Sequence, residues 1–179
     1  MPITVLNPIG PARRTRQIGS PAIADLAGVR IAVLDNTKPN AVEIMLRIGQ
    51  LLVSDYGAAS CEVFRKLSSS QGASEQQLRA ITADYDLVIT GSGDCGSCTS
   101  WSALDAAELE HRGVPAVLLV TDPFVPLART LVQSSGVANL RFAQIPHPIG
   151  GKPTDQMVAL ADQVVESVVS QLKAEVPAA

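Results

Sequence analysis

Two cysteines separated by two residues are the most reactive feature of the sequence. Cys95 and Cys98 lie in the segment Gly-Asp-Cys-Gly-Ser-Cys-Thr, between a short apolar run and a stretch with helical character. A helix N-terminus offers free N–H groups and the positive end of its dipole, which stabilise a thiolate and lower the pKa of a cysteine placed there. The spacing predicts nucleophilic or redox chemistry, with Cys95 the more exposed thiol.

Two other interpretations of the cysteine pair stay open at this point. A structural zinc site generally has four ligands, and besides this pair the sequence offers only Cys61 and two histidines, so we expect no metal. The two cysteines could also be small buried side chains in a strand-to-helix turn. Their place at the start of a predicted helix favours chemistry.

Polar residues near the cysteines are candidate ligands for a substrate. Asn36 and Lys38 follow the first apolar run, where an amide and a cation could hold a carboxylate or another small anion. Asp94 could orient a proton or cap the helix that follows. Ser97 and Thr99 could bind an oxyanion at the helix N-terminus.

Of the other residues that could take part in chemistry, one is a candidate catalytic residue and the rest are expected to be structural. His147 lies in a Pro-rich loop and could serve as acid or base, although its flanking prolines could equally hold it for packing. His111 suits the end of a helix. We expect Trp101 and Leu104 to belong to the core, and Cys61 to be buried and inert.

Composition restricts the class of protein. The 179 residues carry a net charge of -3, which gives no electrostatic case for nucleic acid or an anionic membrane. No apolar run is long enough to span a bilayer, and Pro8 and Gly10 interrupt any signal-peptide core. Three cysteines make no secreted disulfide framework, so a cytoplasmic location is expected.

Alternating periodicities predict the elements that position these residues. Short apolar runs rich in β-branched residues predict strands at 29–34, 61–64, 87–90, 116–121 and 140–145. Helices are expected at 41–56, 74–83, 99–112 and 125–134 and from 154 onward, with Asn40 and Thr154 as caps of the first and last. Residues 1–28 show no clean periodicity and are expected to form an extended arm, lying over the domain or contacting a partner.

Five strands alternating with five helices predict one α/β domain over residues 29–179. We expect a three-layer, doubly wound parallel sheet, flavodoxin-like in its order 2-1-3-4-5, or more broadly Rossmann-like. Ligands of such sheets bind at the carboxyl ends of the strands, where the strand order reverses. The loops 35–40 and 91–98 should therefore face each other, with 121–124 and 146–151 on the same rim.

The motifs around these loops resemble the UGSC family of (seleno)proteins, named for a selenocysteine-Gly-Ser-Cys motif. The resemblance covers Gly-Asp-Cys-Gly-Ser-Cys-Thr-Ser-Trp from Gly93, Asn-x-Lys-Pro-Asn-Ala from Asn36, Glu-Leu-Glu-x-x-Gly-Val-Pro from Glu108 and His-Pro-Ile-Gly from His147. A more distant similarity is to the selenoprotein B component of glycine, sarcosine and betaine reductases. The resemblance implies that Cys95 stands at the selenocysteine position, with a nucleophilic or redox role, and that Cys98 is its partner.

These observations lead to one hypothesis and two alternatives. The chain is expected to be a cysteine-dependent oxidoreductase or lyase, with Cys95 as nucleophile and Cys98 as resolving thiol, acting on a small, anionic organic molecule. The alternatives are non-redox proton transfer of the racemase type and a substrate-binding subunit of a larger reductase complex. A homo-oligomer or a partner subunit is expected, and no cofactor. No G-x-G-x-x-G follows the first strand, so no nucleotide is implied, and the first loop lacks a flavodoxin-type run of hydroxyl residues, so no flavin is expected.

Overall fold

Five parallel strands form the centre of the computed structural model, which describes residues 19–137 and 140–174. The strands are β1 (Arg30–Asp35), β2 (Ser60–Arg65), β3 (Leu87–Gly93), β4 (Ala116–Thr121) and β5 (Arg141–Ile145). Their order in the sheet is β2-β1-β3-β4-β5, with every pairing parallel. The predicted fold class and strand order are thereby confirmed. The part of the predicted arm before residue 19 lies outside the described residues.

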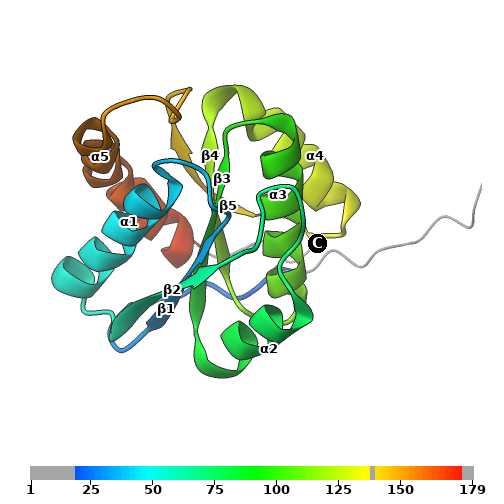
Figure 1. The fold of residues 1–179 in the computed structure, drawn as a ribbon. Helices are drawn as coiled ribbons and strands as arrows, with labels where there is room; N and C mark the ends of the chain where they lie inside the picture. Colours follow the sequence, from blue (N-terminus) through cyan, green and yellow to red (C-terminus); the bar gives the residue numbers. More distant parts are fainter. Residues whose placement is uncertain (1–18, 138–139, 175–179) are drawn as a thin grey trace, which may run out of the picture.

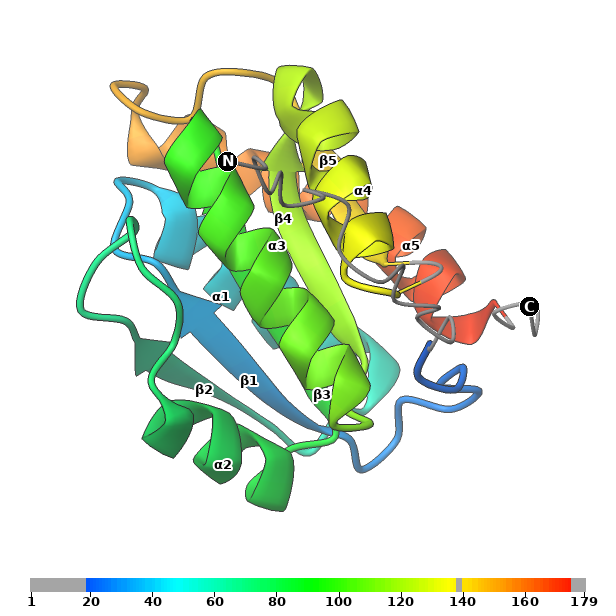
Figure 2. The ribbon, with the colours of Figure 1, turned by 90° about the vertical axis from the view of Figure 1, so that its right-hand side faces the viewer.

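Helices cover both faces of this sheet (Figures 1 and 2). One face carries α1 (Ala41–Tyr56) and α5 (Thr154–Lys173), and the other carries α2 (Glu75–Asp84), α3 (Gly96–His111) and α4 (Val125–Ser134). A short 3₁₀-helix, η1 (Asp122–Phe124), joins β4 to α4. No helix within the described ranges is long and apolar enough to cross a bilayer.

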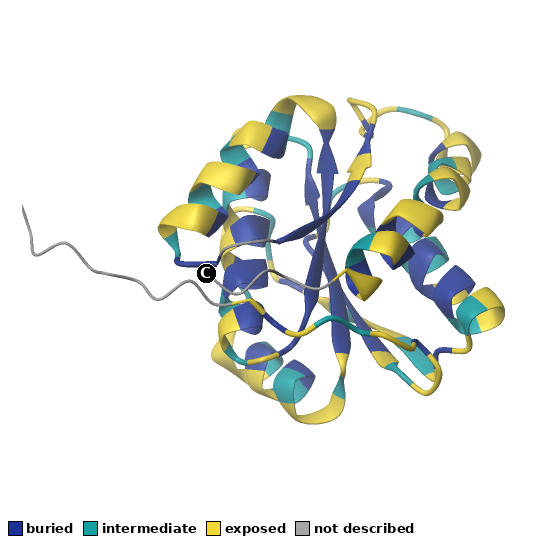
Figure 3. Ribbon diagram, turned by 180° about the vertical axis from the view of Figure 1, so that it is seen from behind, coloured by how far each residue is buried: buried dark blue, intermediate teal, exposed yellow. Residues whose placement is uncertain are grey.

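Strand residues alternate between two apolar cores. Ile31 and Val33 of β1 pack with α1 and α5, whereas Ala32 and Leu34 pack toward α2, α3 and α4. Every residue of β3 and β4 is buried, and Figure 3 shows the central strands as the buried interior. Burial on both faces is what parallel strands between two helical layers require, and it explains their continuous apolar runs.

The caps of α1 and α5 follow the prediction only in part. Asn40 is the N-cap residue of α1 as predicted, but its backbone is left-handed (φ 65°) and its side chain makes no capping hydrogen bond. Thr154 is the first residue of α5 and not its cap. Instead, Thr154 Oγ1 donates to Asn40 Oδ1 at 3.0 Å, and Asn40 Nδ2 donates to the carbonyls of Ile149 and Lys152 at 2.7 and 3.0 Å. Asn40 therefore joins the loop after β1 to the loop after β5.

Trp101 and Leu104 do not belong to the core, which corrects a second prediction. They are 39% and 37% exposed on the outer side of α3. The inner side of α3 is built from small residues such as Ala103, Ala106 and Ala107, all buried. Small side chains let this part of the helix approach the sheet closely, while Trp101 and Leu104 lie on the opposite side of α3.

Candidate active site

The loops that follow β1, β3 and β5 meet around a small cleft. The cleft has a volume of about 150 Å³ and is lined by Lys38, Pro39, Asp94, Cys95, Ile149 and Gly150. At about 30 Å³ per water molecule in the liquid, this volume equals that of about five waters. The meeting of these loops was predicted from the strand order.

Cys95 is the N-cap of α3. Its backbone is extended, and its sulfur accepts a hydrogen bond from the backbone N–H of Cys98 at 3.3 Å. The helix thus begins at Gly96, three residues before the predicted start at residue 99, and the cap is Cys95 and not Asp94. A cysteine sulfur occupies the position that a Ser or Asp oxygen usually takes, and this is why the start was misplaced.

The sulfurs of Cys95 and Cys98 lie at disulfide distance from one another and differ in access. Their Cα atoms are 5.5 Å apart, within the usual range for bonded cysteines. Cys95 is partly exposed in the cleft, whereas Cys98 is 0% exposed. The Oγ of Ser97 lies 3.7 Å from the sulfur of Cys95. A molecule in the cleft can therefore reach Cys95 first, with Cys98 behind it.

Asp94 pairs with His147 beside the cysteines. Oδ1 of Asp94 lies 2.9 Å from Nδ1 of His147 and also accepts from the N–H of Ile149 at 3.3 Å. A carboxylate at this distance accepts from Nδ1–H, which leaves Nε2 as the free nitrogen of a neutral imidazole. The side chains of His147 and Asp94 are 38% and 14% exposed. Asp94 lines the cleft and thereby holds the imidazole of His147 next to it.

Thr121 is a third member of this group that sequence reasoning missed. Its Oγ1 donates to the carbonyl of Gly93 at 3.1 Å and lies 3.2 Å from Nδ1 of His147. Its position as the last residue of a predicted strand, at the same sheet edge as the cysteines, could have identified it as a site residue. Asn40, which holds the carbonyl of Ile149, was likewise assigned only to helix capping.

Lys38 brings a positive charge to the cleft. It is partly exposed and lines the cleft together with Asp94 and Cys95. Within residues 19–137 and 140–174, no carboxylate oxygen lies within 4.0 Å of its amine. An ammonium group without such a partner is available to an anionic ligand.

Asn36 and Thr99 lie beneath the cleft and bond to the protein. Asn36 Nδ2 donates to the carbonyl of Ser92 at 2.8 Å and to Oγ of Ser102 at 3.1 Å, and Thr99 Oγ1 donates to the carbonyl of Cys95 at 2.6 Å. Both residues are 0% exposed. Their predicted contact with substrate stays a prediction, while their hydrogen bonds fix the loop that carries Cys95.

Cys61 lies on the edge strand β2, away from these residues. It is partly buried, and burial raises the pKa of its thiol to about 11. The thiol is therefore protonated at neutral pH and a poor nucleophile. No group of three His, Cys, Asp or Glu side chains able to hold a metal ion occurs among the described residues.

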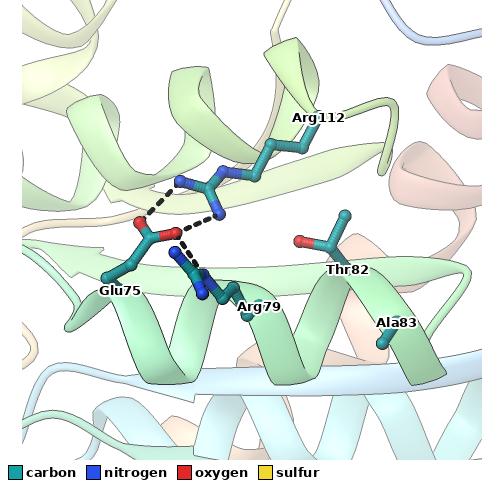
Figure 4. A pocket seen from close by; sticks show the side chains of 5 residues that line it. All are labelled: Glu75, Arg79, Thr82, Ala83 and Arg112. Atoms are coloured by element: carbon teal, nitrogen blue, oxygen red, sulfur yellow. Dashed lines mark hydrogen bonds and ion pairs between the residues drawn. The ribbon is translucent and has the colours of Figure 1, made fainter.

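A second depression lies over α2 and the end of α3 (Figure 4). Glu75 bonds there to both Arg79 and Arg112, which lower the pKa of its carboxyl to about 2, Arg112 contributing most. The carboxylate of Glu75 pairs with both guanidinium groups. None of the predicted site residues lines this depression. It offers charge pairing and no reactive group.

Two solved structures show similarity to this chain at low sequence identity. The sugar isomerase domain of an RpiR transcription factor from Sphaerobacter thermophilus covers 82% of this chain and 72% of its own, with 20% identity and a TM-score of 0.45. The Flv1 flavodiiron core from Synechocystis covers 82% of this chain and 36% of its own, with 13% identity and a TM-score of 0.45.

Two curated relatives are named glycine reductase complex component B subunit gamma. The protein from Carboxydothermus hydrogenoformans is 34% identical over 105 residues, 55% of this chain and 23% of its own length. The protein from Peptoclostridium litorale is 33% identical over 113 residues, 62% of this chain and 24% of its own. The chain matches about a quarter of the length of these relatives. The model of the UGSC family matches residues 4–174, and the chain therefore belongs to the UGSC family.

Proposed function

We propose that this chain is a thiol-dependent reductase component that acts on a small anionic organic molecule. The observation that carries the proposal is the unequal cysteine pair. Cys95 lines the cleft and receives a hydrogen bond at the N-terminus of α3, and Cys98 is buried within bonding distance of it. An exposed thiol held against a buried one is the arrangement that a nucleophile and its resolving thiol require.

The reaction can be written with a small disulfide as the simplest substrate. The thiolate of Cys95 attacks one substrate sulfur, the substrate S–S bond breaks, and the first thiolate leaves with a proton. Cys98 then attacks the sulfur of Cys95, the second substrate thiolate leaves with a proton, and the Cys95–Cys98 disulfide remains. Two electrons and two protons pass from the two cysteines to the substrate. A dithiol reductant then restores the protein, as expected in a reducing, cytoplasmic compartment.

The other residues of the cleft have separate roles in this scheme. His147, oriented by Asp94 at 2.9 Å, gives a proton to the leaving group and receives one in return. Lys38 and the first N–H groups of α3 hold the negative charge of the substrate near Cys95. The volume of about 150 Å³ limits the part of the substrate that enters.

The comparisons support a role within a larger assembly. Both curated relatives are named as subunits of a glycine reductase complex component, and this chain matches about a quarter of their length. A chain that carries one reactive cleft and corresponds to part of a larger subunit is suited to work with a partner. We therefore include a partner subunit, or a second copy of the chain, in the proposal.

A second candidate is proton transfer without redox chemistry. The Asp94–His147 pair favours it, because Asp94 lines the cleft beside Cys95 and orients an imidazole that, with the thiol, can remove and return a proton. In that case Cys98 serves only to hold the first turn of α3. The two candidates differ in whether Cys98 is needed chemically.

The test uses the reduced chain and dithiodiglycolate, a small disulfide that carries two carboxylates. In a single turnover the unchanged protein should release two molecules of mercaptoacetate and form the Cys95–Cys98 disulfide. Cys98→Ser should release one and retain the other as an adduct on Cys95, visible by mass spectrometry. Cys95→Ser should release none.

The outcomes separate the two candidates. If Cys98→Ser releases two molecules as fast as the unchanged protein, the resolving role is wrong. If Cys95→Ser reacts as the unchanged protein does, the nucleophile is wrong as well. All variants are made in a Cys61→Ala background, so that Cys61 cannot react with the disulfide, and Cys61 does not line the cleft.

A further inference from the structure

The loop that carries Lys38 is anchored on both sides of this residue. Before it, the N–H of Thr37 donates to Oδ1 of the buried Asp35 at 2.8 Å. After it, the side chain of Asn40 makes hydrogen bonds to three residues that follow β5 in the chain. Lys38 and Pro39 thus form a short span between two fixed ends, and both of them line the cleft.

The two anchors of this span have a backbone conformation that side chains rarely allow. Thr37 and Asn40 have φ angles of 67° and 65°, and they are the only non-glycine residues with positive φ in the described part of the chain. For a β-branched residue such as Thr37 this conformation is an outlier. It persists only where surrounding contacts impose it, and such residues cluster at active sites and ligand clamps. The outlier therefore indicates a functional reason for the shape of the loop around Lys38.

Asn40 connects two of the loops that form the cleft. The loop after β1 contributes Lys38 to the cleft, and the loop after β5 contributes Ile149. Asn40 is only 9% exposed, and its Nδ2 donates to the carbonyl of Ile149 at 2.7 Å. The N–H of Ile149 in turn donates to Oδ1 of Asp94 at 3.3 Å, in the loop that carries Cys95. Ile149 is therefore held from both neighbouring loops, and through it Asn40 is tied to the loop of the reactive thiol.

We infer that Asn40 is a positioning residue that holds Lys38 beside Cys95 and thereby sets the preference of the cleft for anions. Lys38 carries its charge on a flexible stem, so a loop without the Asn40 bonds would spread that charge over a larger volume. A group that is in place for only part of the time strengthens binding only in proportion to that fraction. The inference rests on the proposed function in one respect, the assignment of Lys38 as the group that holds an anionic substrate.

Alkylation of Cys95 in the reduced protein, with two reagents of similar size and different charge, tests this inference. Iodoacetate carries a carboxylate and iodoacetamide does not, so the ratio of their rates reports the charge that Lys38 presents to the cleft. Lys38→Gln should lower this ratio about tenfold, the effect of losing one charge-assisted hydrogen bond. Asn40→Gly should lower it about threefold, which corresponds to an amine in place for about a third of the time. Glycine adopts the left-handed backbone freely, so this variant removes the side-chain bonds and keeps the turn.

A double substitution separates positioning from a general loss of structure. In the Lys38→Gln protein, Asn40→Gly should leave the ratio unchanged, because no charge remains to be positioned. Thr154→Val keeps both bonds from Asn40 Nδ2 and should lower the ratio less than Asn40→Gly does. Cys61, retained in these proteins, reports the fold in the same samples. Its sulfur packs against Gly49 of α1, so its alkylation should stay slow in every folded variant.

The outcomes distinguish this inference from the proposed function, because the test needs no disulfide substrate. A lower ratio in Lys38→Gln with an unchanged ratio in Asn40→Gly would overturn the inference and leave the anion-binding role of Lys38 intact. An unchanged ratio in Lys38→Gln would refute both. An equal fall for Asn40→Gly with and without Lys38 would also overturn the inference. If Asn40→Gly exposes Cys61, Asn40→Ser, which is also neutral, is measured in its place against the same expectations.

Discussion

The backbone N–H of Cys98 donates to the sulfur of Cys95 across 3.3 Å, so the thiol that lines the cleft is also the cap of the helix behind it. The N–H groups and the dipole of α3 therefore act on the sulfur directly and favour its thiolate form. The same hydrogen bond brings the thiol of Cys98 to within one helical turn of Cys95.

The first prediction compares Cys95 with Cys61 in alkylation. Burial raises the pKa of Cys61 to about 11, from an ordinary 9.0, so at pH 8 it should react with iodoacetamide about a hundredfold more slowly than an unshifted thiol. Because the thiolate fraction grows tenfold per pH unit below the pKa, its rate should still rise steeply up to about pH 11. Cys95, at the helix N-terminus, should react first and show a weaker pH dependence.

Peptide mapping of the reduced protein after graded alkylation measures both rates in one sample. Cys61→Ala should leave the rate at Cys95 unchanged, because the two cysteines lie on different strands and loops. Labelling of Cys61 ahead of Cys95 would contradict the assignment of the reactive thiol.

The sheet and most helices followed from the sequence, because their determinants are local. Apolar β-branched runs placed β1 and β4 to within a residue, and alternation of strands with helices fixed a parallel sheet. The start of α3 was misplaced because a cysteine served as its cap. Trp101 and Leu104 were assigned to the core because spacing reveals two faces of a helix, but not which face the sheet contacts.

The cleft followed from topology, but its hydrogen bonds did not. Lys38, Cys95 and Asp94 could be placed together because the carboxyl ends of parallel strands share an edge. The bonds from His147 to Asp94, 53 residues apart, and to Thr121 depend on the path of the loop after β5. No local sequence pattern predicts such a contact. The burial of Asn36 could not be predicted either, because it depends on contacts with Ser92 and Ser102, more than fifty residues away.

The second prediction concerns the charge of Lys38. Lys38→Gln should slow the single-turnover reaction with dithiodiglycolate about tenfold, the effect of losing one charge-assisted hydrogen bond. The reaction with cystamine, a cationic disulfide of similar size, should be unchanged or faster. Lys152→Gln is the matched control, since Lys152 lies in a neighbouring loop and does not line the cleft. Equal losses for both disulfides would refute the anion-binding role.

The third prediction separates the two carboxylates of the Glu-Leu-Glu motif. Glu110 is buried, pairs with Arg141 at 3.1 Å and accepts the N–H groups of Ser20 and Ala116. Glu110→Gln should reduce the free energy of unfolding by about 3 kcal/mol, because a buried guanidinium loses its counter-charge. Glu108→Gln, which affects a more exposed pair with Arg112, should cost less than about 1 kcal/mol. Urea unfolding measures both, and similar losses would contradict this division.

The fourth prediction is a pH dependence at Glu75. Arg112 and Arg79 hold the pKa of its carboxyl at about 2, below an ordinary 4.5. A depressed pKa in the folded state contributes stability above pH 4.5 that is lost as the pH falls through about 2. Glu75→Gln should therefore flatten the decline of stability over this range, most clearly at low salt. Glu166→Gln, exposed on α5, should keep the slope of the unchanged protein.

The last prediction tests whether Asp94 orients His147 for proton transfer. Asp94→Asn keeps a hydrogen-bond acceptor beside Nδ1 at similar size but removes the negative charge that stabilises the imidazolium. The single-turnover rate should fall about tenfold, within the range for general acid catalysis. Thr121→Val, which removes only the contact at 3.2 Å, should have a smaller effect, and His111→Gln none. If Asp94→Asn and Thr121→Val react as fast as the unchanged protein, Asp94 serves only the loop through Ile149 and does not orient His147 as the acid.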